Sequence, residues 1–207
     1  LSQYCFAIYP IVAHLAGADC IVVPAQNYGH DLPSMAAAIT PETRIVFVAN
    51  PNNPTGTLAP RADVLELIEK TPEHTLLVMD EAYFEFLDDP VNLLPLLRDN
   101  SNLLLMRTFS KIHGLAGLRV GYAIGHAEFV GELEKIRQPF NVNAIAQTAA
   151  LAALEDQNHL EATRANNANG LKYFEKNLSA LNIETVRAHA NFILAKVGDG
   201  ERIFLKL

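Results

Sequence analysis

The sequence has little of the chemistry on which several large protein classes depend, beginning with cysteine. It contains two cysteines, Cys5 and Cys20, in 207 residues. Two cysteines cannot build a disulfide framework, and their spacing matches no metal-binding motif. We therefore expect both to be free thiols in a reducing compartment, which favours a cytoplasmic protein.

Positive charge is also sparse. The 16 lysines and arginines are outnumbered by 23 acidic residues, the formal net charge is −7, and the basic residues form no cluster. This excludes the basic patch that is typical of nucleic-acid binding. No apolar run approaches the roughly 20 residues that span a bilayer, and the first residues lack the pattern of a secretion signal. We expect neither a nucleic-acid partner nor a membrane anchor.

Several motifs of common enzyme classes are absent. The sequence has no G-x-x-x-x-G-K-[ST] phosphate loop, no H-E-x-x-H, no G-x-S-x-G and no G-x-G-x-x-G. His126-Ala127-Glu128 resembles the start of a zinc deaminase motif, but the P-C-x-x-C that should follow is missing. These absences argue against a P-loop hydrolase, a zinc enzyme and a serine hydrolase.

The apolar residues, half of the chain, form short continuous runs that alternate with segments of helical period. Predicted strands are Cys20–Pro24, Arg44–Ala49, Thr75–Met79, Leu103–Arg107 and Val120–Ile124. Predicted helices are Tyr4–Leu15, Pro33–Ile39, Pro60–Lys70, Ala127–Arg137 and Asn143–Glu155. Continuous apolar strands are typical of a sheet that helices cover on both faces. The pattern predicts an α/β fold with a mostly parallel sheet.

The pattern changes after Glu155. A long polar helix is predicted over Asn158–Leu178, followed by a strand pair at Glu184–Arg187 and Asn191–Val197. We therefore predict a large domain over residues 1–155 and the start of a smaller α+β domain over residues 156–207. Because the chain begins with Leu1 rather than Met and stops inside this second domain, we expect it to be a fragment of a longer protein.

The run from Thr108 to Arg119 carries the most informative chemistry. The apolar segment Leu103–Met106 precedes Thr108, Ser110 and Lys111, and Arg119 follows eight residues after Lys111. Hydroxyls and a guanidinium suit a phosphate group. A lysine beside a cation is a candidate for bonding an aldehyde, because the neighbouring charge lowers its pKa and frees the amine. Together they indicate an aldehyde cofactor that carries a phosphate, pyridoxal phosphate (PLP).

Two further motifs follow apolar strands. Asn50-Pro51-Asn52-Asn53-Pro54-Thr55-Gly56 predicts a rigid turn that can present a carboxamide to a ligand. Asp80 ends another strand, at the edge where open α/β sheets bind ligands, and a carboxylate there can keep a ring nitrogen protonated. Tyr83 can hydrogen-bond a ring hydroxyl. The strand ending in Asp80-Glu81 also resembles the magnesium strand of P-loop hydrolases, an interpretation that the missing phosphate loop excludes.

These motifs, in this order, resemble the fold-type-I PLP-dependent aminotransferases, and among them most closely the histidinol-phosphate aminotransferases. The resemblance rests on N-P-N-N-P-T-G, D-E-A-Y, and R-T-F-S-K followed by L-A-G-L-R-V-G-Y. It extends over residues 4 to 155 and continues more weakly through Asn191-Phe192. The resemblance implies transamination of histidinol phosphate with 2-oxoglutarate, giving imidazole acetol phosphate and glutamate, in a homodimer that acts in histidine biosynthesis.

The resemblance also implies a role for each site residue. Lys111 would bond the cofactor aldehyde and, once displaced by the amino substrate, would move the proton. Asp80 would pair with the pyridinium nitrogen, Asn53 and Tyr83 would bind the ring oxygen, and Phe6 would stack on the ring. Three residues would hold the phosphate: Thr108, Ser110 and Arg119. Asn52 is the less favoured amide donor of the turn.

The resemblance places other parts of the pocket outside this sequence. A phosphate-binding turn and a tyrosine from the partner subunit are expected before Leu1, and the arginine that binds the substrate is expected after Leu207. The identity of the substrate therefore stays open. An aromatic-amino-acid aminotransferase and a threonine-phosphate decarboxylase are the alternative enzymes. A PLP-binding sensor domain of a transcription regulator is an alternative of a different class.

Overall fold

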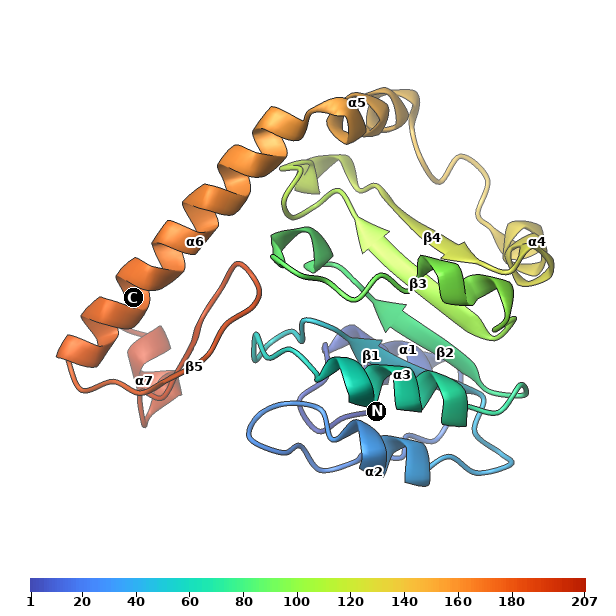
Figure 1. Ribbon diagram of the computed structural model, residues 1–207, viewed down its shortest axis with the longest axis horizontal. Helices are drawn as coiled ribbons and strands as arrows, with labels where there is room; N and C mark the ends of the chain where they lie inside the picture. Colours follow the sequence, from blue (N-terminus) through green and yellow to red (C-terminus); the bar gives the residue numbers. More distant parts are fainter.

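A sheet of four strands forms the centre of the computed structural model, which describes residues 1–207. The strands are β1 (Ile45–Ala49), β2 (Leu76–Asp80), β3 (Leu103–Thr108) and β4 (Gly121–Gly125), and they lie in that order across the sheet (Figure 1). The first three are parallel and β4 runs antiparallel to β3. This confirms the predicted α/β class with a mostly parallel sheet.

The register of the sheet brings the predicted motifs to one edge. Ala49 pairs with Asp80, and Asp80 pairs with Met106 on β3. The N-P-N-N-P-T-G turn, Asp80 and the Thr108–Lys111 segment therefore leave neighbouring parallel strands at their carboxyl ends. Thr108 itself pairs with Gly121, so the start of β4 lies beside the same edge.

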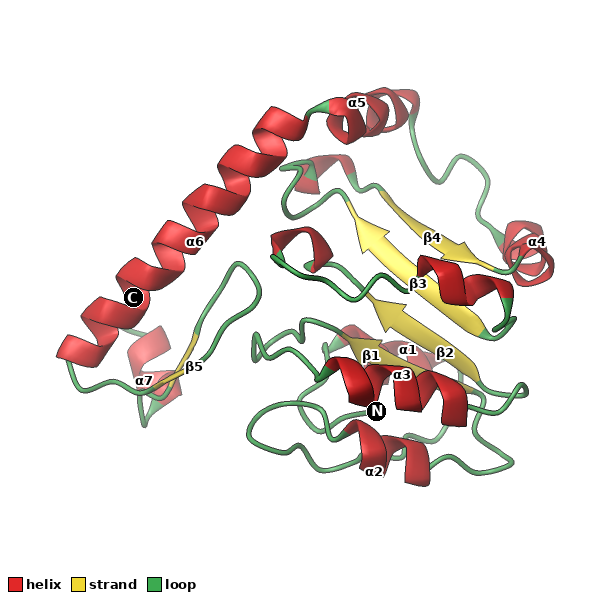
Figure 2. Cartoon of the chain, viewed as in Figure 1, coloured by secondary structure: helices red, strands yellow, loops and turns green.

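Helices cover both faces of the sheet. Figure 2 shows α1 (Ile8–Leu15) on one face and α2 (Leu32–Ala37) with α3 (Arg61–Lys70) on the other. Apolar residues of α3 at helical spacing are buried, and they join β-strand residues such as Val48 and Leu105 in the main core. The side chain of Asp31 caps α2 by accepting a hydrogen bond from the Ser34 N–H, which satisfies one of the free donors at a helix start.

The predicted strand at Cys20–Pro24 is wrong. Within this segment the structure contains one isolated bridge, in which Val23 pairs with Ser2. Ile21 and Val22 are about half exposed, at 50% and 57%. An apolar run becomes a strand only when a neighbouring strand pairs with its backbone, and here the pairing is limited to the first residues of the chain. The predicted helix at Tyr4–Leu15 also begins later, at Ile8.

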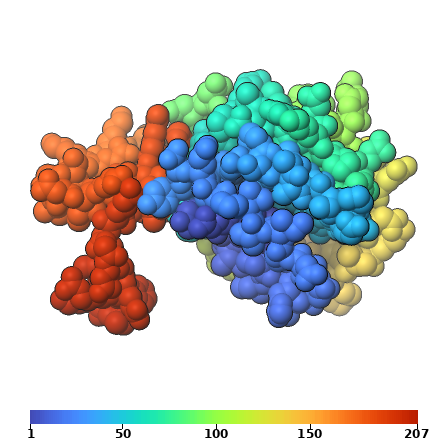
Figure 3. Space-filling view, turned by 90° about the horizontal axis from the view of Figure 1, so that it is seen from below, coloured from blue at the N-terminus to red at the C-terminus, as the bar shows by residue number.

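The part of the chain that follows β4 is mostly helical. The helices are α4 (Ala127–Ile136), α5 (Ala144–Glu155), the 24-residue α6 (Gln157–Ala180) and α7 (Gly200–Phe204), with a short hairpin of β5 (Thr185–Val186) and β6 (Leu194–Ala195). Three 3₁₀ turns, at Phe84–Phe86, Leu94–Arg98 and Ala116–Leu118, and α7 were not predicted. Figure 3 shows the C-terminal residues as a lobe beside the main body. None of the helices combines the length and hydropathy that a membrane span requires.

The loop between β5 and β6 returns to the sheet edge. The backbone N–H of His189 donates to the carbonyl of Gly56 at 2.7 Å, and the ring of Phe192 meets that of Tyr83 edge-on at 5.3 Å. Helix α6 is held as well, since Arg164 Nε donates to the carbonyl of Glu85 at 2.8 Å. The C-terminal segment therefore lies against the two motifs that carry Asn53 and Tyr83.

Candidate active site

The half-buried carboxylate of Asp80 lies at the centre of the candidate site. Its Oδ2 accepts a hydrogen bond of 2.7 Å from the Tyr9 hydroxyl, and its Oδ1 accepts one of 3.1 Å from the Ala82 N–H. Burial raises the pKa of Asp80, while these two hydrogen bonds and the charge of Lys111 oppose the shift. Asp80 takes part in none of the ion pairs of the structure. A half-buried carboxylate without a cationic partner is suited to a cationic ligand group.

Sequence reasoning did not identify Tyr9 as a site residue. Tyr9 is buried on α1, where its ring stacks on Phe47 at 4.7 Å and 10° between planes. Burial and the adjacent Asp80 charge both raise the pKa of its hydroxyl, so Tyr9 stays protonated and donates a hydrogen bond to Asp80. The signal available in the sequence was its spacing of three residues from Phe6, which places both rings on one side of a helical turn. Phe6 is half-buried and meets Tyr9 edge-on at 5.7 Å.

Lys111 lies close to the other predicted residues. Its Nζ is 5.3 Å from the centroid of the Tyr83 ring, and the Tyr83 hydroxyl accepts a hydrogen bond of 3.2 Å from Asn53 Nδ2. Asn53 and Tyr83 come from different strand ends, so the structure brings them together as the sequence predicted. Lys111 Nζ has no carboxylate partner within ion-pair distance.

Asn52, the less favoured amide donor of the turn, has a structural role. It is fully buried, and its Nδ2 donates to the Tyr4 carbonyl at 2.6 Å and to Thr55 Oγ1 at 2.9 Å. Its amide therefore holds the turn together through Thr55 and ties it to the first residues of the chain through Tyr4. Asn53, in contrast, is partly exposed at the site.

Of the three predicted phosphate residues, Thr108 ends β3, and Ser110 and Arg119 lie on the loop that connects β3 to β4. Thr108 Oγ1 accepts a hydrogen bond of 3.0 Å from the Ser110 N–H, which folds this segment back on itself. Arg119 is brought near because the Phe109 N–H donates to the carbonyl of Val120 at 3.2 Å. The Arg119 guanidinium is exposed and donates to the Ala116 carbonyl at 2.7 Å, with no direct contact to Thr108 or Ser110.

The donor set fits PLP. A pyridinium nitrogen would supply the positive partner that the half-buried Asp80 lacks, and Lys111 offers an amine that no carboxylate engages. The hydroxyl and guanidinium groups at the end of β3 and on the β3–β4 loop are the chemistry that a phosphate requires. The half-buried Phe6 ring offers an apolar surface next to Tyr9, the residue that binds Asp80.

Comparisons with known proteins agree with this chemistry. A family model described as aminotransferase class I and II matches residues 1–207. Histidinol-phosphate aminotransferase 1 of Thiobacillus denitrificans is 49% identical over 214 residues, which cover 100% of this chain and 54% of the relative. Histidinol-phosphate aminotransferase of Akkermansia muciniphila is 44% identical and covers 98% of this chain and 56% of the relative. This chain thus spans about half the length of these curated relatives.

A comparison with a solved structure places the fold in the same family. Histidinol-phosphate aminotransferase from Sinorhizobium meliloti, in complex with pyridoxal-5′-phosphate, superposes with a TM-score of 0.91 at 32% identity. The match covers 96% of this chain and 54% of that chain.

Proposed function

Because the chain belongs to the class I and II aminotransferases, we propose that it forms the cofactor-holding part of a PLP-dependent aminotransferase. The observation that carries the proposal is the proximity of Asp80 and Lys111, which are not bonded to each other. A half-buried carboxylate without a cationic partner lies within electrostatic range of an amine that has no carboxylate partner. The relative from Sinorhizobium meliloti, which is described as a complex with PLP, supports this choice of cofactor.

Each residue has a role in holding PLP. Lys111 Nζ would bond the aldehyde carbon, and Asp80, held by Tyr9 and the Ala82 N–H, would accept the ring N–H. Asn53 and Tyr83, already in contact with each other, would bind the ring oxygen. Phe6 would cover one face of the ring. The phosphate would be held by Thr108 at the end of β3 and by Ser110 and Arg119 of the β3–β4 loop.

The catalytic residue is Lys111. When bound, PLP supplies the electron sink that stabilises negative charge on the substrate carbon. Asp80 keeps the ring nitrogen protonated, which strengthens that sink. The Lys111 amine would act as the base that takes a proton from the substrate carbon and as the acid that returns it. The Tyr83 hydroxyl and the Asn53 amide fix the orientation of the ring during this transfer.

The proposed reaction is transamination of L-histidinol phosphate with 2-oxoglutarate, giving imidazole acetol phosphate and L-glutamate in histidine biosynthesis. The names of the relatives from Thiobacillus denitrificans and Akkermansia muciniphila, at 49% and 44% identity, support this substrate.

The test uses the full-length protein with PLP and 2-oxoglutarate, and compares kcat/KM for histidinol phosphate, phenylalanine, tyrosine and O-phosphothreonine. Histidinol phosphate should be favoured by at least about 100-fold, because differential transition-state binding sets specificity. Lys111→Ala should abolish turnover, and Lys135→Ala, at an exposed lysine, should not. A preference for phenylalanine or tyrosine, or decarboxylation of O-phosphothreonine, would contradict the substrate. PLP binding without turnover of any donor would favour the sensor domain.

The oligomeric state, compartment and domain division belong to the same proposal. We propose a cytoplasmic homodimer with a boundary between Glu155 and Asp156. Support for the dimer comes from large apolar side chains exposed on α4, α5 and the segment between them: Ile136, Phe140, Ile145 and Leu151. Large apolar side chains exposed along consecutive segments of the chain are candidates for an association surface. Sedimentation of the full-length protein tests the dimer, and a monomer at micromolar concentration would contradict it.

A further inference from the structure

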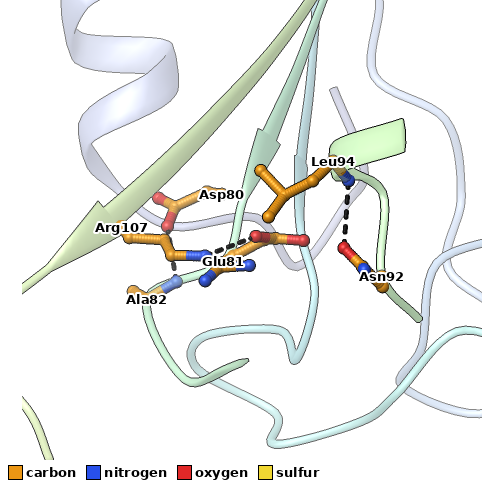
Figure 4. A network of polar contacts seen from close by, with 6 residues as sticks. All are labelled: Asp80, Glu81, Ala82, Asn92, Leu94 and Arg107. Carbon is orange, nitrogen blue, oxygen red and sulfur yellow. Dashed lines mark hydrogen bonds and ion pairs between the residues drawn. The ribbon is translucent and has the colours of Figure 1, made fainter. Parts of the chain in front are cut away.

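One ion pair is set apart from all others by its burial. Arg107 Nε donates to Glu81 Oε2 at 2.8 Å, and the two side chains are 12% and 4% exposed (Figure 4). In every other ion pair both side chains are more than a third exposed. The Arg107 guanidinium also lies 3.8 Å above the Phe84 ring. Both partners are therefore fixed in position by packing as well as by charge.

The sequence neighbours of the pair are the cofactor residues proposed above. Glu81 directly follows Asp80, and Arg107 directly precedes Thr108. The backbone joins the same two segments, since the Glu81 N–H donates to the Met106 carbonyl at 2.8 Å. The side-chain pair is thus a second connection between the end of β2 and the end of β3.

The Glu81–Arg107 pair lies on the opposite face of the sheet from the hydrogen bond between Tyr9 and Asp80. Asp80 is held by Tyr9 from α1, whereas Glu81 lines a cavity of about 110 Å³ together with Val64 of α3. These two helices cover opposite faces (Figure 1). Successive side chains of an extended segment point to opposite faces, which explains the arrangement. Glu81 and Arg107 therefore do not compete with the ligand for space.

Stability alone does not account for such a pair. Burial raises the pKa of Glu81 despite its bond to Arg107. Arg107 Nη2, moreover, is buried without a hydrogen-bond partner. Burying two charges is costly, and apolar side chains of similar volume often replace a buried ion pair without loss of stability. What apolar side chains cannot reproduce is a directional bond between two specific atoms.

We propose that Glu81 and Arg107 are positioning residues of the cofactor site. Their bond sets the lateral distance between Asp80 and the Thr108–Lys111 segment, so that the carboxylate and the amine reach one ligand at the same time. This inference rests on the proposed function, because it assumes that Asp80 and Lys111 bind the same molecule.

The test replaces the pair by apolar residues, E81L/R107M, in the full-length protein. The cofactor-free melting temperature should stay close to that of the wild type, while the PLP dissociation constant, from absorbance titration, should rise at least about tenfold. The matched control is E134L/R137M, because Arg137 and Glu134 have the same Nε–Oε2 distance of 2.8 Å but are exposed. The control should bind PLP as the wild type does.

A second variant keeps the test informative if E81L/R107M does not fold. R107K retains the charge but lacks the planar group that lies on Phe84, and it should weaken PLP binding by about threefold or more with little change in melting temperature. Wild-type PLP affinity in a folded E81L/R107M, or in R107K, would overturn the positioning role. Failure of the wild-type protein to bind PLP would instead overturn the proposed function.

Discussion

The Tyr9 hydroxyl donates a 2.7 Å hydrogen bond to Asp80 Oδ2, joining two residues that are 71 positions apart. Tyr9 is itself immobilised by its stack on Phe47. Charge-assisted hydrogen bonds of this kind are stronger than neutral ones and fix the direction of the carboxylate. The contact makes α1 part of the candidate site, although no residue of α1 was predicted to have a role there.

Tyr9→Phe tests this contact. The variant keeps the ring and its stack but leaves Asp80 without the hydrogen bond that opposes the rise of its pKa. The pKa of Asp80 should rise further, so the acid side of the pH profile of kcat/KM should move to higher pH. Activity near pH 7 should fall by about tenfold, because hydrogen bonds to charged groups contribute about 1.5–3 kcal/mol. Tyr173→Phe, at a ring that is 65% exposed, is the control. If the acid side of the kcat/KM profile does not move in Tyr9→Phe, the contact has no electrostatic role.

Asp80→Asn should increase the stability of the cofactor-free protein while it lowers the activity. Burial raises the pKa of Asp80 above its usual value of 3.8, so its ionised form is disfavoured in the folded, cofactor-free protein. That cost is absent below the unfolded pKa and is complete above the folded pKa. At neutral pH the variant should therefore unfold at higher denaturant concentration than the cofactor-free wild type, and this advantage should disappear below about pH 4. Turnover should fall by at least about 100-fold. A less stable cofactor-free variant at neutral pH would contradict this account of Asp80.

Gly56→Ala tests how the β5–β6 loop is held. Gly56 has a φ of +74°, and an added Cβ would lie 3.3 Å from both Cα and Cβ of Ala188. Gly17 has a similar φ of +69° with no atom within 4 Å, so Gly17→Ala measures the backbone cost alone. That cost is about 1–2 kcal/mol. Gly56→Ala should lower the free energy of unfolding by more than Gly17→Ala, and it should increase proteolysis within the loop. Equal losses for the two variants would show that the loop does not depend on this close approach.

The sequence predicted the strands of the sheet more accurately than the segments that connect and surround them. β1, β2 and β3 agree with their predicted bounds to within one residue, because continuous apolar runs with polar ends mark buried parallel strands. The direction of β4 was left open, and it depends on the connection from Phe109 to Val120, which contains a 3₁₀ turn in place of a crossover helix. The segment Cys20–Pro24 has strand-like residues but almost no pairing partner, and local pattern alone could not reveal that.

For the candidate site, the predictable part is the set of motifs at strand ends. Asn53 and Tyr83, predicted from separate motifs, are in hydrogen-bond contact, and Lys111 lies beside them. Tyr9 and the Glu81–Arg107 pair were not identified, because each depends on a contact between segments distant in sequence. Apart from its spacing from Phe6, Tyr9 looks in the sequence like any core tyrosine of an apolar helix. A charged residue next to a site residue likewise has no local pattern that distinguishes it from a surface position.

The most direct test of the central claim is to find which residue bonds the cofactor. The full-length protein with PLP is reduced with borohydride, which converts a lysine–PLP bond into a stable amine, and is then digested and mapped by mass spectrometry. The account predicts a pyridoxyl group on Lys111 and no label on the chain in Lys111→Ala. A label on another lysine, or no label on a protein that turns over amino donors, would contradict it.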